Sequence, residues 1–321
     1  MSSLRKLDKD HALAELAAVR SLIDQLADDD YFTRISLESR ATDLQEEVAS
    51  FGDIDTRVGA SAALFFGGRP VLGTRGIEAE FAGQAVSKFQ DLVSKMYALN
   101  FVGLGTRGVV PQKAASALHI TNVVRGSFGF LLEEESNSLL ETPLNAAVED
   151  TTKLLAALGQ NDEEEFRTAV ESIDARVLAT AKEFFSLMDE SAATLRLVTS
   201  DFEQQFGSDA VVRALERAST TAVEDTREIV IGQLAGVLPE AHQFEFRSLD
   251  GRGTIRGRVD RSLTTQELIN FNSTWVNRTS QAEMMVRRVV ENGTVVRLSY
   301  TLLSIQAPPQ LSTQLTISQG R

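Results

Sequence analysis

Two copies of one pentapeptide each place an arginine between glycines. The segment 72–76 reads Leu-Gly-Thr-Arg-Gly, and the segment 104–108 repeats it. Glycine-rich turns that carry Thr and Arg side chains are typical of anion-binding nests. If the two turns meet in space, Arg75, Arg107 and Arg125 would surround a phosphate or carboxylate ligand. The alternative is two unrelated turns of similar composition, and the sequence leaves both interpretations open.

The second copy overlaps a G-x-G-x-x-G pattern at Gly103, Gly105 and Gly108. A dinucleotide site with this pattern needs a strand before it and a helix after it, so that the helix N-terminus faces the pyrophosphate. Here the pattern follows a predicted helix, and Pro111 interrupts what comes next. We therefore interpret these glycines as a loop between a helix and a strand.

A second set of candidate residues lies in the last third of the chain. Residues 224–321 contain 11 Arg, no Lys and 10 acidic residues, a net of +1, whereas the remaining 21 basic and 35 acidic residues give −14. Arginine beside an aromatic side chain is typical of surfaces that bind single-stranded nucleic acid through phosphate contacts and base stacking. The candidates for such a surface, or for binding a protein partner, are Arg247, Arg256, Arg258, Arg261, Trp275, Arg278, Arg287 and Arg297.

A structural role for the same residues is the competing interpretation. The arginines would pair with Glu245, Asp260 and Glu283, as oppositely charged residues on neighbouring strands often do. Trp275, the single tryptophan, would then fill the end of a small domain. The near-zero net charge of this segment favours pairing over binding.

Catalytic motifs are missing. The chain has no cysteine, which excludes thiolate zinc sites, iron–sulfur clusters and a cysteine nucleophile. Its three histidines, His11, His119 and His242, have no second histidine at metal-ligand spacing. The pair Asp53 and Asp55 resembles a metal-binding D-x-D motif but precedes its predicted strand. We expect no metal, no cofactor and a non-catalytic protein, although an enzyme built from scattered acidic residues stays open.

The elements that must position the arginine-rich set form a recognisable order. Alternating apolar residues, with hairpin signals at Asp250-Gly251 and Asn292-Gly293, predict three strands, a short helix and two more strands. This order resembles the five-stranded oligonucleotide-binding (OB) barrel, with an SH3-like barrel as the alternative. In the last strand we expect Val296, Leu298, Tyr300 and Leu302 to face inward. The predicted ranges are 228–237, 242–248 and 253–259 for strands, 264–271 for the helix, and 281–290 and 294–303 for strands.

The rest of the chain is mostly helical in pattern. Residues 11–27 and 36–50 carry apolar stripes at heptad-like spacing, which predicts a helical hairpin. The hairpin either packs on its own domain or serves as an assembly element. After it we expect a small α/β domain continued by a helical bundle, with Thr142 and Asn161 as helix N-caps. The expected strands are 57–66, 117–124, 127–134 and 194–198, and the expected helices are 78–99, 142–158, 161–188 (continuous or broken near Ser172) and 208–221.

Composition places the chain among globular proteins. It has 321 residues, 43% of them hydrophobic, and a net charge of −13. No run of about 18 apolar residues predicts a membrane span, and the charged first ten residues do not form a signal peptide. We therefore expect a cytoplasmic α+β protein that does not contact membranes. The predicted divisions are residues 1–52 (hairpin), 53–223 (α/β domain with helices), 224–306 (barrel) and 307–321 (flexible tail).

Three functional hypotheses follow. The first is a non-catalytic intracellular binding or assembly protein, in which the barrel recognises a partner and the hairpin mediates homo-oligomerisation or docking to a partner protein. The second is a component of a bacterial antiviral defence or mobile-element system that binds single-stranded nucleic acid. The third is a phosphate-ligand sensor or enzyme that uses Arg75, Arg107 and Arg125.

Overall fold

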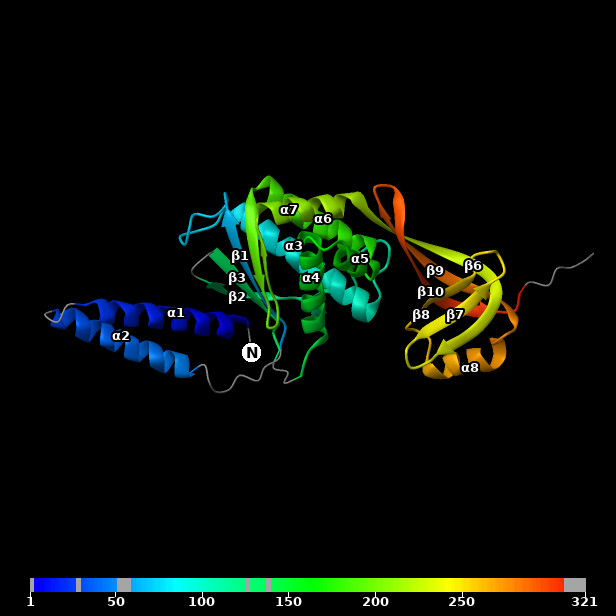
Figure 1. Ribbon diagram of the computed structural model, residues 1–321, viewed down its shortest axis with the longest axis horizontal. Helices are drawn as coiled ribbons and strands as arrows, with labels where there is room; N and C mark the ends of the chain where they lie inside the picture. The colour runs from blue at the N-terminus through cyan, green and yellow to red at the C-terminus, as the bar shows by residue number, and fades with distance from the viewer. Residues whose placement is uncertain (1–2, 27–29, 51–58, 125–127, 137–139, 309–321) are drawn as a thin grey trace, which may run out of the picture. The chain divides into compact units, whose positions relative to one another are not determined.

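The computed structural model describes residues 3–26, 30–50, 59–124, 128–136 and 140–308 (Figure 1). The chain forms two compact units, Met1–Ser219 and Thr220–Arg321. Helices and strands occur in both units, so the fold class is α+β. None of the helices within the described ranges is long and apolar enough to cross a membrane.

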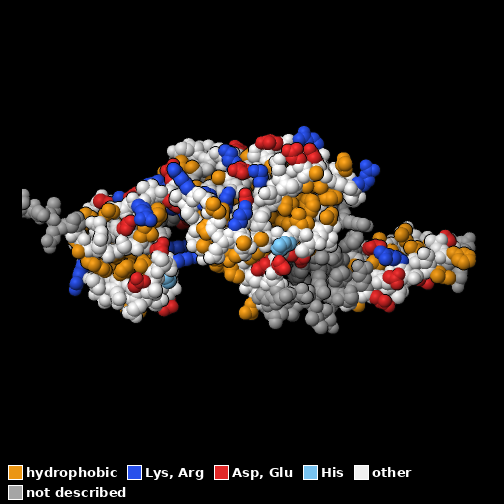
Figure 2. Space-filling view, turned by 180° about the vertical axis from the view of Figure 1, so that it is seen from behind, with side chains coloured by type: hydrophobic (Ala, Val, Ile, Leu, Met, Phe, Trp, Pro, Cys, Tyr) orange, Lys and Arg blue, Asp and Glu red, His pale blue; other side chains and the backbone are white. Residues whose placement is uncertain are grey.

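The N-terminal unit begins with the predicted helical hairpin. Helix α1 spans Ser3–Gln25 and helix α2 spans Tyr31–Ser50, and both begin earlier than their apolar stripes indicate. Their interface is a small core of Leu16, Val19 and Leu44. Hydrophobic side chains also gather at the end of the hairpin that is nearest the connection between α1 and α2 (Figure 2). The exposed ones in this region are Leu22, Phe32 and Ile35.

A five-stranded antiparallel sheet forms the centre of the N-terminal unit. The strand order is β2-β3-β1-β4-β5. Four strands were expected, whereas β5 is short and polar and therefore gives no clear apolar alternation in the sequence. The strands span Ser61–Gly68 (β1), His119–Val124 (β2), Phe128–Glu133 (β3), Ala193–Val198 (β4) and Glu203–Phe206 (β5).

Three helices form the main helical layer of this unit. Helix α3 packs against both α4 and α6, and the ring of Phe81 on α3 makes an edge contact with that of Phe66 on β1, with 5.4 Å between centroids. Such contacts bury the apolar stripes that the sequence predicts. The helices span Ala79–Tyr97 (α3), Pro143–Gly159 (α4), Glu163–Glu171 (α5), Ala175–Glu190 (α6) and Ser208–Thr220 (α7). A π-helical turn, Ala98–Val102, follows α3, and a 3₁₀ turn covers Lys113–Ser116.

Helix ends follow the predicted capping chemistry, with one correction. Thr142 caps α4, because its side-chain oxygen accepts a hydrogen bond from the Asn145 N–H at 3.1 Å. The predicted cap at Asn161 is wrong by one residue: Asp162 caps α5 by accepting hydrogen bonds from two backbone N–H groups. An Asp carboxylate also stabilises the positive end of the helix dipole, which the neutral Asn side chain does less well.

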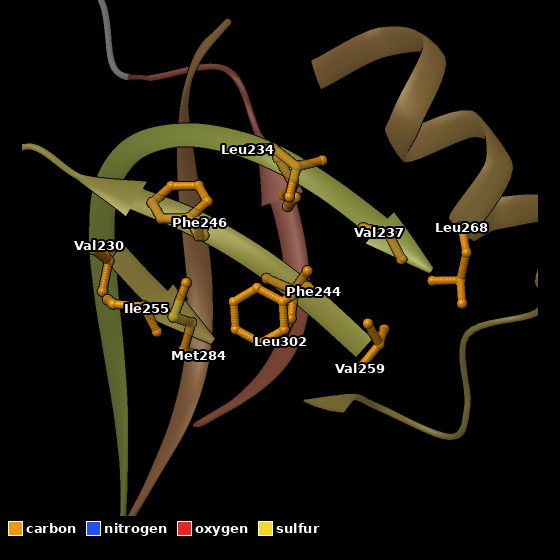
Figure 3. Packing of buried hydrophobic residues seen from close by; sticks show 12 residues of the cluster. Val230, Leu234, Val237, Phe244, Phe246, Ile255, Val259, Leu268, Met284 and Leu302 are labelled. Atoms are coloured by element: carbon orange, nitrogen blue, oxygen red, sulfur yellow. The ribbon is translucent and has the colours of Figure 1, made fainter. Parts of the chain in front are cut away.

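The C-terminal unit is a closed five-stranded barrel. Its strand order is β10-β8-β7-β6-β9, and all pairs are antiparallel except β8 with β10, which is parallel. Phe244, Phe246, Leu234 and Met284 are among the buried residues that fill it (Figure 3). The elements span Thr221–Leu238 (β6), Gln243–Ser248 (β7), Thr254–Val259 (β8), Thr265–Trp275 (α8), Thr279–Glu291 (β9) and Thr294–Gln306 (β10).

Two glycines allow the barrel strands to approach closely. A Cβ atom on Gly257 would lie 2.1 Å from the Tyr300 carbonyl oxygen, and one on Gly232 would lie 2.2 Å from the Arg247 carbonyl oxygen. Neither separation is possible between real atoms, so any side chain at these positions forces the strands apart. Gly257 therefore permits the contact between β8 and β10 that closes the barrel.

Three strands continue beyond the barrel as a ribbon. The first half of β6, Thr221–Ile231, pairs with β9, while its pairing with β7 begins only at Gly232. This arrangement corrects the predicted inward orientation of part of β10. Leu302 is buried and Tyr300 packs on the core, but Val296 and Leu298 are exposed because the barrel does not extend to them.

Candidate functional site

The repeated pentapeptides lie at opposite ends of one helix. Arg75 belongs to a tight turn closed by the Val71–Ile77 bridge, just before α3 begins. Arg107 lies in the loop that follows the end of α3. Because the 19 residues of α3 rise by about 28 Å, the structure does not bring these two arginines together. Arg125 lies outside the described residues.

The second pentapeptide is held by an arginine from another helix. The Arg176 guanidinium donates hydrogen bonds to the carbonyl oxygens of Gly105 (2.7 Å) and Gly108 (2.6 Å). The loop thus turns carbonyl oxygens toward a cation, whereas an anion nest presents N–H groups to its ligand. We therefore interpret the G-x-G-x-x-G segment as a loop that makes a structural contact with Arg176.

Three of the predicted arginines share one face of the barrel. Arg247 on β7 and Arg256 and Arg258 on β8 all point outward, because the intervening residues of both strands face the core. In the β7–β8 ladder, Arg247 lies opposite Thr254, Arg256 opposite Glu245, and Arg258 opposite Gln243. We call Arg247, Arg256 and Arg258 the arginine face. Arg256 and Arg258 are about 7 Å apart along the strand.

The arginine face is poorly neutralised. Its one ion pair within the described part of the chain joins Arg256 to Glu245 at 3.5 Å, and the Arg256 side chain remains 78% exposed. Arg247 and Arg258 are exposed and make no ion pair with any residue in the described ranges. A local excess of positive charge therefore exists on a unit whose net charge is close to zero.

Neighbouring arginines of the barrel are neutralised. Glu228 on β6 forms ion pairs with Arg252 (2.6 Å) and with Arg288 on β9. The hydrogen bond from Arg252 is the main reason why the pKa of Glu228 lies below its usual value. Arg287, one of the predicted binding residues, makes two hydrogen bonds to Asp225, at 2.8 and 2.7 Å. Its guanidinium is therefore occupied by a structural ion pair.

The remaining predicted residues lie outside the β7–β8 ladder. Trp275, at the end of α8, packs against the barrel core, as the structural interpretation expected. Arg278 is exposed between α8 and β9, and Arg261 is exposed between β8 and α8. Arg297 lies on β10, opposite Val289. The barrel thus divides the eight candidates into one cluster of three and five separate positions.

Aromatic side chains are absent from the arginine face. Phe244 and Phe246, the aromatic residues of β7, point into the core. The other outward residues of the β7–β8 ladder are Gln243, Glu245 and Thr254. This surface can pair with phosphate or carboxylate groups through guanidinium N–H donors. It offers no ring on which a nucleic acid base would stack.

The candidate metal-binding residues do not come together in the described part of the chain. No group of three His, Cys, Asp or Glu side chains there could hold a metal ion. His119 is exposed, with its Nε2 atom 3.8 Å from a Glu135 oxygen. His242 lies in the β6–β7 turn, where its Nδ1 is buried without a hydrogen-bond partner among the described residues. Asp53 and Asp55 lie outside the described ranges.

Comparison with known proteins identified no relative: no family model, no curated protein and no solved structure matches this chain.

Proposed function

We propose that this chain is a non-catalytic binding and assembly protein whose C-terminal barrel recognises a partner that carries negative charge. The arginine face is the observation that carries this proposal. Of its three exposed guanidinium groups, only that of Arg256 has an ion pair among the described residues, whereas Glu228 and Asp225 neutralise other arginines of the same unit. Exposed like charges repel each other in the free protein, and an anionic partner relieves that repulsion.

Barrel topology supports an OB-type assignment over an SH3-like one. The third and fifth strands of the unit, β8 and β10, pair in parallel, and helix α8 lies between the third and fourth strands. An OB barrel has this parallel pair and this helix, whereas an SH3-like barrel pairs its strands in antiparallel fashion. OB barrels bind ligands on the face of their second and third strands. In this chain those strands are β7 and β8, which carry the arginine face.

Single-stranded nucleic acid is the specific partner that the arginine face favours. Regularly spaced guanidinium groups match a chain of phosphates, and each neutralised phosphate of a single strand contributes about 0.7 to the salt dependence of log K. The absence of aromatic residues from the face predicts binding through phosphates with little base preference. An acidic segment of a partner protein would meet the same donors and is the competing occupant.

The hairpin supports the assembly part of the proposal. Leu22, Phe32 and Ile35 are exposed near the turn that joins α1 and α2. Large apolar side chains exposed together often mark protein interaction sites. The predicted roles, homo-oligomerisation or docking of a partner protein, remain our proposal for this element.

The test is a titration of full-length protein into fluorescently labelled single-stranded DNA and RNA, followed by anisotropy at 50 and 200 mM salt. Three phosphate contacts predict a slope of about −2 for log K against log salt concentration. The Arg256→Glu/Arg258→Glu variant should bind at least tenfold more weakly, with a shallower slope. Absence of binding at 50 mM salt would remove nucleic acid as the partner.

A charge-matched control separates the arginine face from net charge. Arg75→Glu/Arg107→Glu makes the same change in charge on two exposed loops of the N-terminal unit. We expect this variant to bind like the unmodified protein. Equal weakening in both double variants would show that overall charge, and not the β7–β8 surface, determines binding.

A further inference from the structure

The ribbon that continues from the barrel has two edges that no further strand of the described residues joins. One edge is the first part of β6, from Thr221 to Ile231, whose ladder within the described residues is with β9 alone. The other is the first part of β10, from Thr294 to Ser299, because β8 meets β10 only at Thr301 and Leu302. Unpaired backbone N–H and C=O groups along an edge can add another strand.

The two edges differ in their protection. The β6 edge carries charged residues at Glu224, Asp225, Arg227 and Glu228. Charge is one of the features by which proteins prevent unwanted strand pairing. The β10 edge carries one charged residue, Arg297, and no proline or lysine. Its apolar residues Val295 and Leu298 are 47% and 48% exposed.

A β-bulge places these two apolar residues on the same face. Leu298 lies opposite Arg288, and Val295 lies opposite Val290, two residues further along β9. Opposed residues share a face, and so do residues two apart on a strand. The bulge at Val296 therefore aligns side chains that are three positions apart. Thr294, Arg297 and Ser299 lie on the opposite face by the same argument.

This pattern is complementary to itself in one antiparallel register. When residue numbers of the two strands add to 593, Val295 lies opposite Leu298 of a second copy, and Thr294 lies opposite its Ser299. Within each pair, the two residues lie on the same face of the ribbon: Val295 and Leu298 on one face, Thr294 and Ser299 on the other. The arginines do not oppose each other, because Arg297 faces Val296. Apolar and hydroxyl pairs of this kind each stabilise an antiparallel ladder.

We propose that two copies of this chain pair through the β10 edge, from Thr294 to Ser299, around a two-fold axis. The interface joins the ribbons of the two copies into one six-stranded sheet and covers Val295 and Leu298 of both chains. The same patch serves both partners, as a two-fold interface requires. This inference does not depend on the arginine face, which lies on β7 and β8.

Cysteine cross-linking tests the register directly. The chain contains no cysteine, so introduced thiols are its only ones. Thr294→Cys and Ser299→Cys are made as separate variants, and each is oxidised alone and after mixing with the other. In the proposed dimer, residue 294 of one copy opposes residue 299 of the other within disulfide range. Two residues 294, or two residues 299, lie about 16 Å apart.

The expected result is a cross-linked species of twice 35.1 kDa in the mixture and not in either variant alone. Leu249→Cys, at an exposed position between β7 and β8, replaces Thr294→Cys in the control mixture and should not cross-link. Equal cross-linking in the control, or none in the test mixture, would overturn the proposal.

Solution mass gives an independent measurement. Light scattering should report a dimer of the unmodified protein at micromolar concentration and a monomer for Val295→Lys/Leu298→Lys. Leu249→Lys should remain dimeric. Circular dichroism confirms that each variant is folded, which exposed positions should allow. A monomeric unmodified protein, or a double variant with the same solution mass as the unmodified protein, would contradict pairing through β10.

Discussion

Arginines on the β6–β9 ladder form ion pairs with carboxylates, whereas most of those on the arginine face are exposed without one among the described residues. On the ladder, Arg287 pairs with Asp225 directly opposite it on β6, and Arg288 pairs with Glu228, further along the same strand. On the arginine face, Arg247 and Arg258 lie opposite Thr254 and Gln243, which carry no charge. The difference arises from what the neighbouring strand supplies. Cross-strand neighbours thus decide whether an arginine stabilises the barrel or remains available to a ligand.

The largest expected effect comes from the backbone beneath the arginine face. Gly257 lies between Arg256 and Arg258, and a methyl group there would collide with the Tyr300 carbonyl of β10. We expect Gly257→Ala to destabilise the barrel by about 3 kcal/mol, because overpacking forces the strands apart. Urea denaturation measures the loss. Gly236→Ala is the control, since no atom lies within 4 Å of its added Cβ.

On the β6–β9 ladder, loss of the Glu228 carboxylate should lower the free energy of unfolding by an amount that depends on pH. Glu228→Gln leaves Arg252 and Arg288 without their shared carboxylate, and we expect a loss of about 1 kcal/mol at pH 7. The pKa of Glu228 is lowered in the folded protein, so its contribution is present above the unfolded value of about 4.5 and is lost as pH falls through the folded value.

The Tm difference between Glu228→Gln and the unmodified protein should therefore be constant near neutral pH, and it should become smaller as pH falls below about 4.5 toward the lowered pKa of the folded protein. Thermal melts from pH 3 to pH 7 measure it. A difference that persists unchanged at pH 3 would show that the carboxylate does not act through its ionised form.

Single arginine substitutions sharpen the comparison most directly. Arg258→Gln should leave stability within about 0.5 kcal/mol and reduce the salt slope of nucleic acid binding by about 0.7. Arg287→Gln should do the reverse, with a loss of about 1 kcal/mol from the Asp225 pair and an unchanged slope. Urea denaturation and anisotropy on the same two variants measure both quantities. The assignment fails if Arg258→Gln is the destabilising one.

The smallest effect concerns the one carboxylate within the arginine face. Glu245 lies 3.5 Å from Arg256 and competes with a bound anion for that guanidinium. We expect Glu245→Gln to strengthen anion binding two- to fivefold, which corresponds to less than about 1 kcal/mol for an exposed pair. Anisotropy at 50 mM salt resolves a change of this size. Weaker binding would indicate that Glu245 orients Arg256 for its ligand.

Much of the fold was predictable from local pattern. Thr142 with Pro143 at a helix start, and Asn292-Gly293 between two strands, act through neighbouring residues only, and the structure confirms both. Strand β5 was missed because its polar residues give no periodic signal. The inward orientation predicted for Leu298 was wrong, since alternation shows which residues share a face but not how far the core extends.

The candidate site was less predictable, because it depends on which strands lie next to each other in the barrel. Spacing along the chain placed Arg256 and Arg258 on one side of a strand, which the structure confirms. Joining Arg247 to them, and excluding Arg287, depended on which strands are neighbours. The repeated pentapeptides show the opposite case, because identical sequences lie at the two ends of α3.

The sequence by itself determined the order of the strands and helix of the C-terminal unit, the Thr142 cap, the hairpin turn at Asn292-Gly293 and the excess of arginine in the last third. These features depend on contacts between residues close in the chain, whose geometry follows from φ, ψ and side-chain type. Only the tertiary structure decided which arginines are neutralised and which edge of the ribbon is apolar and unpaired. Both depend on residues that are distant in sequence, such as Arg287 with Asp225 and Tyr300 with Gly257, which meet only when the strands of the C-terminal unit pair.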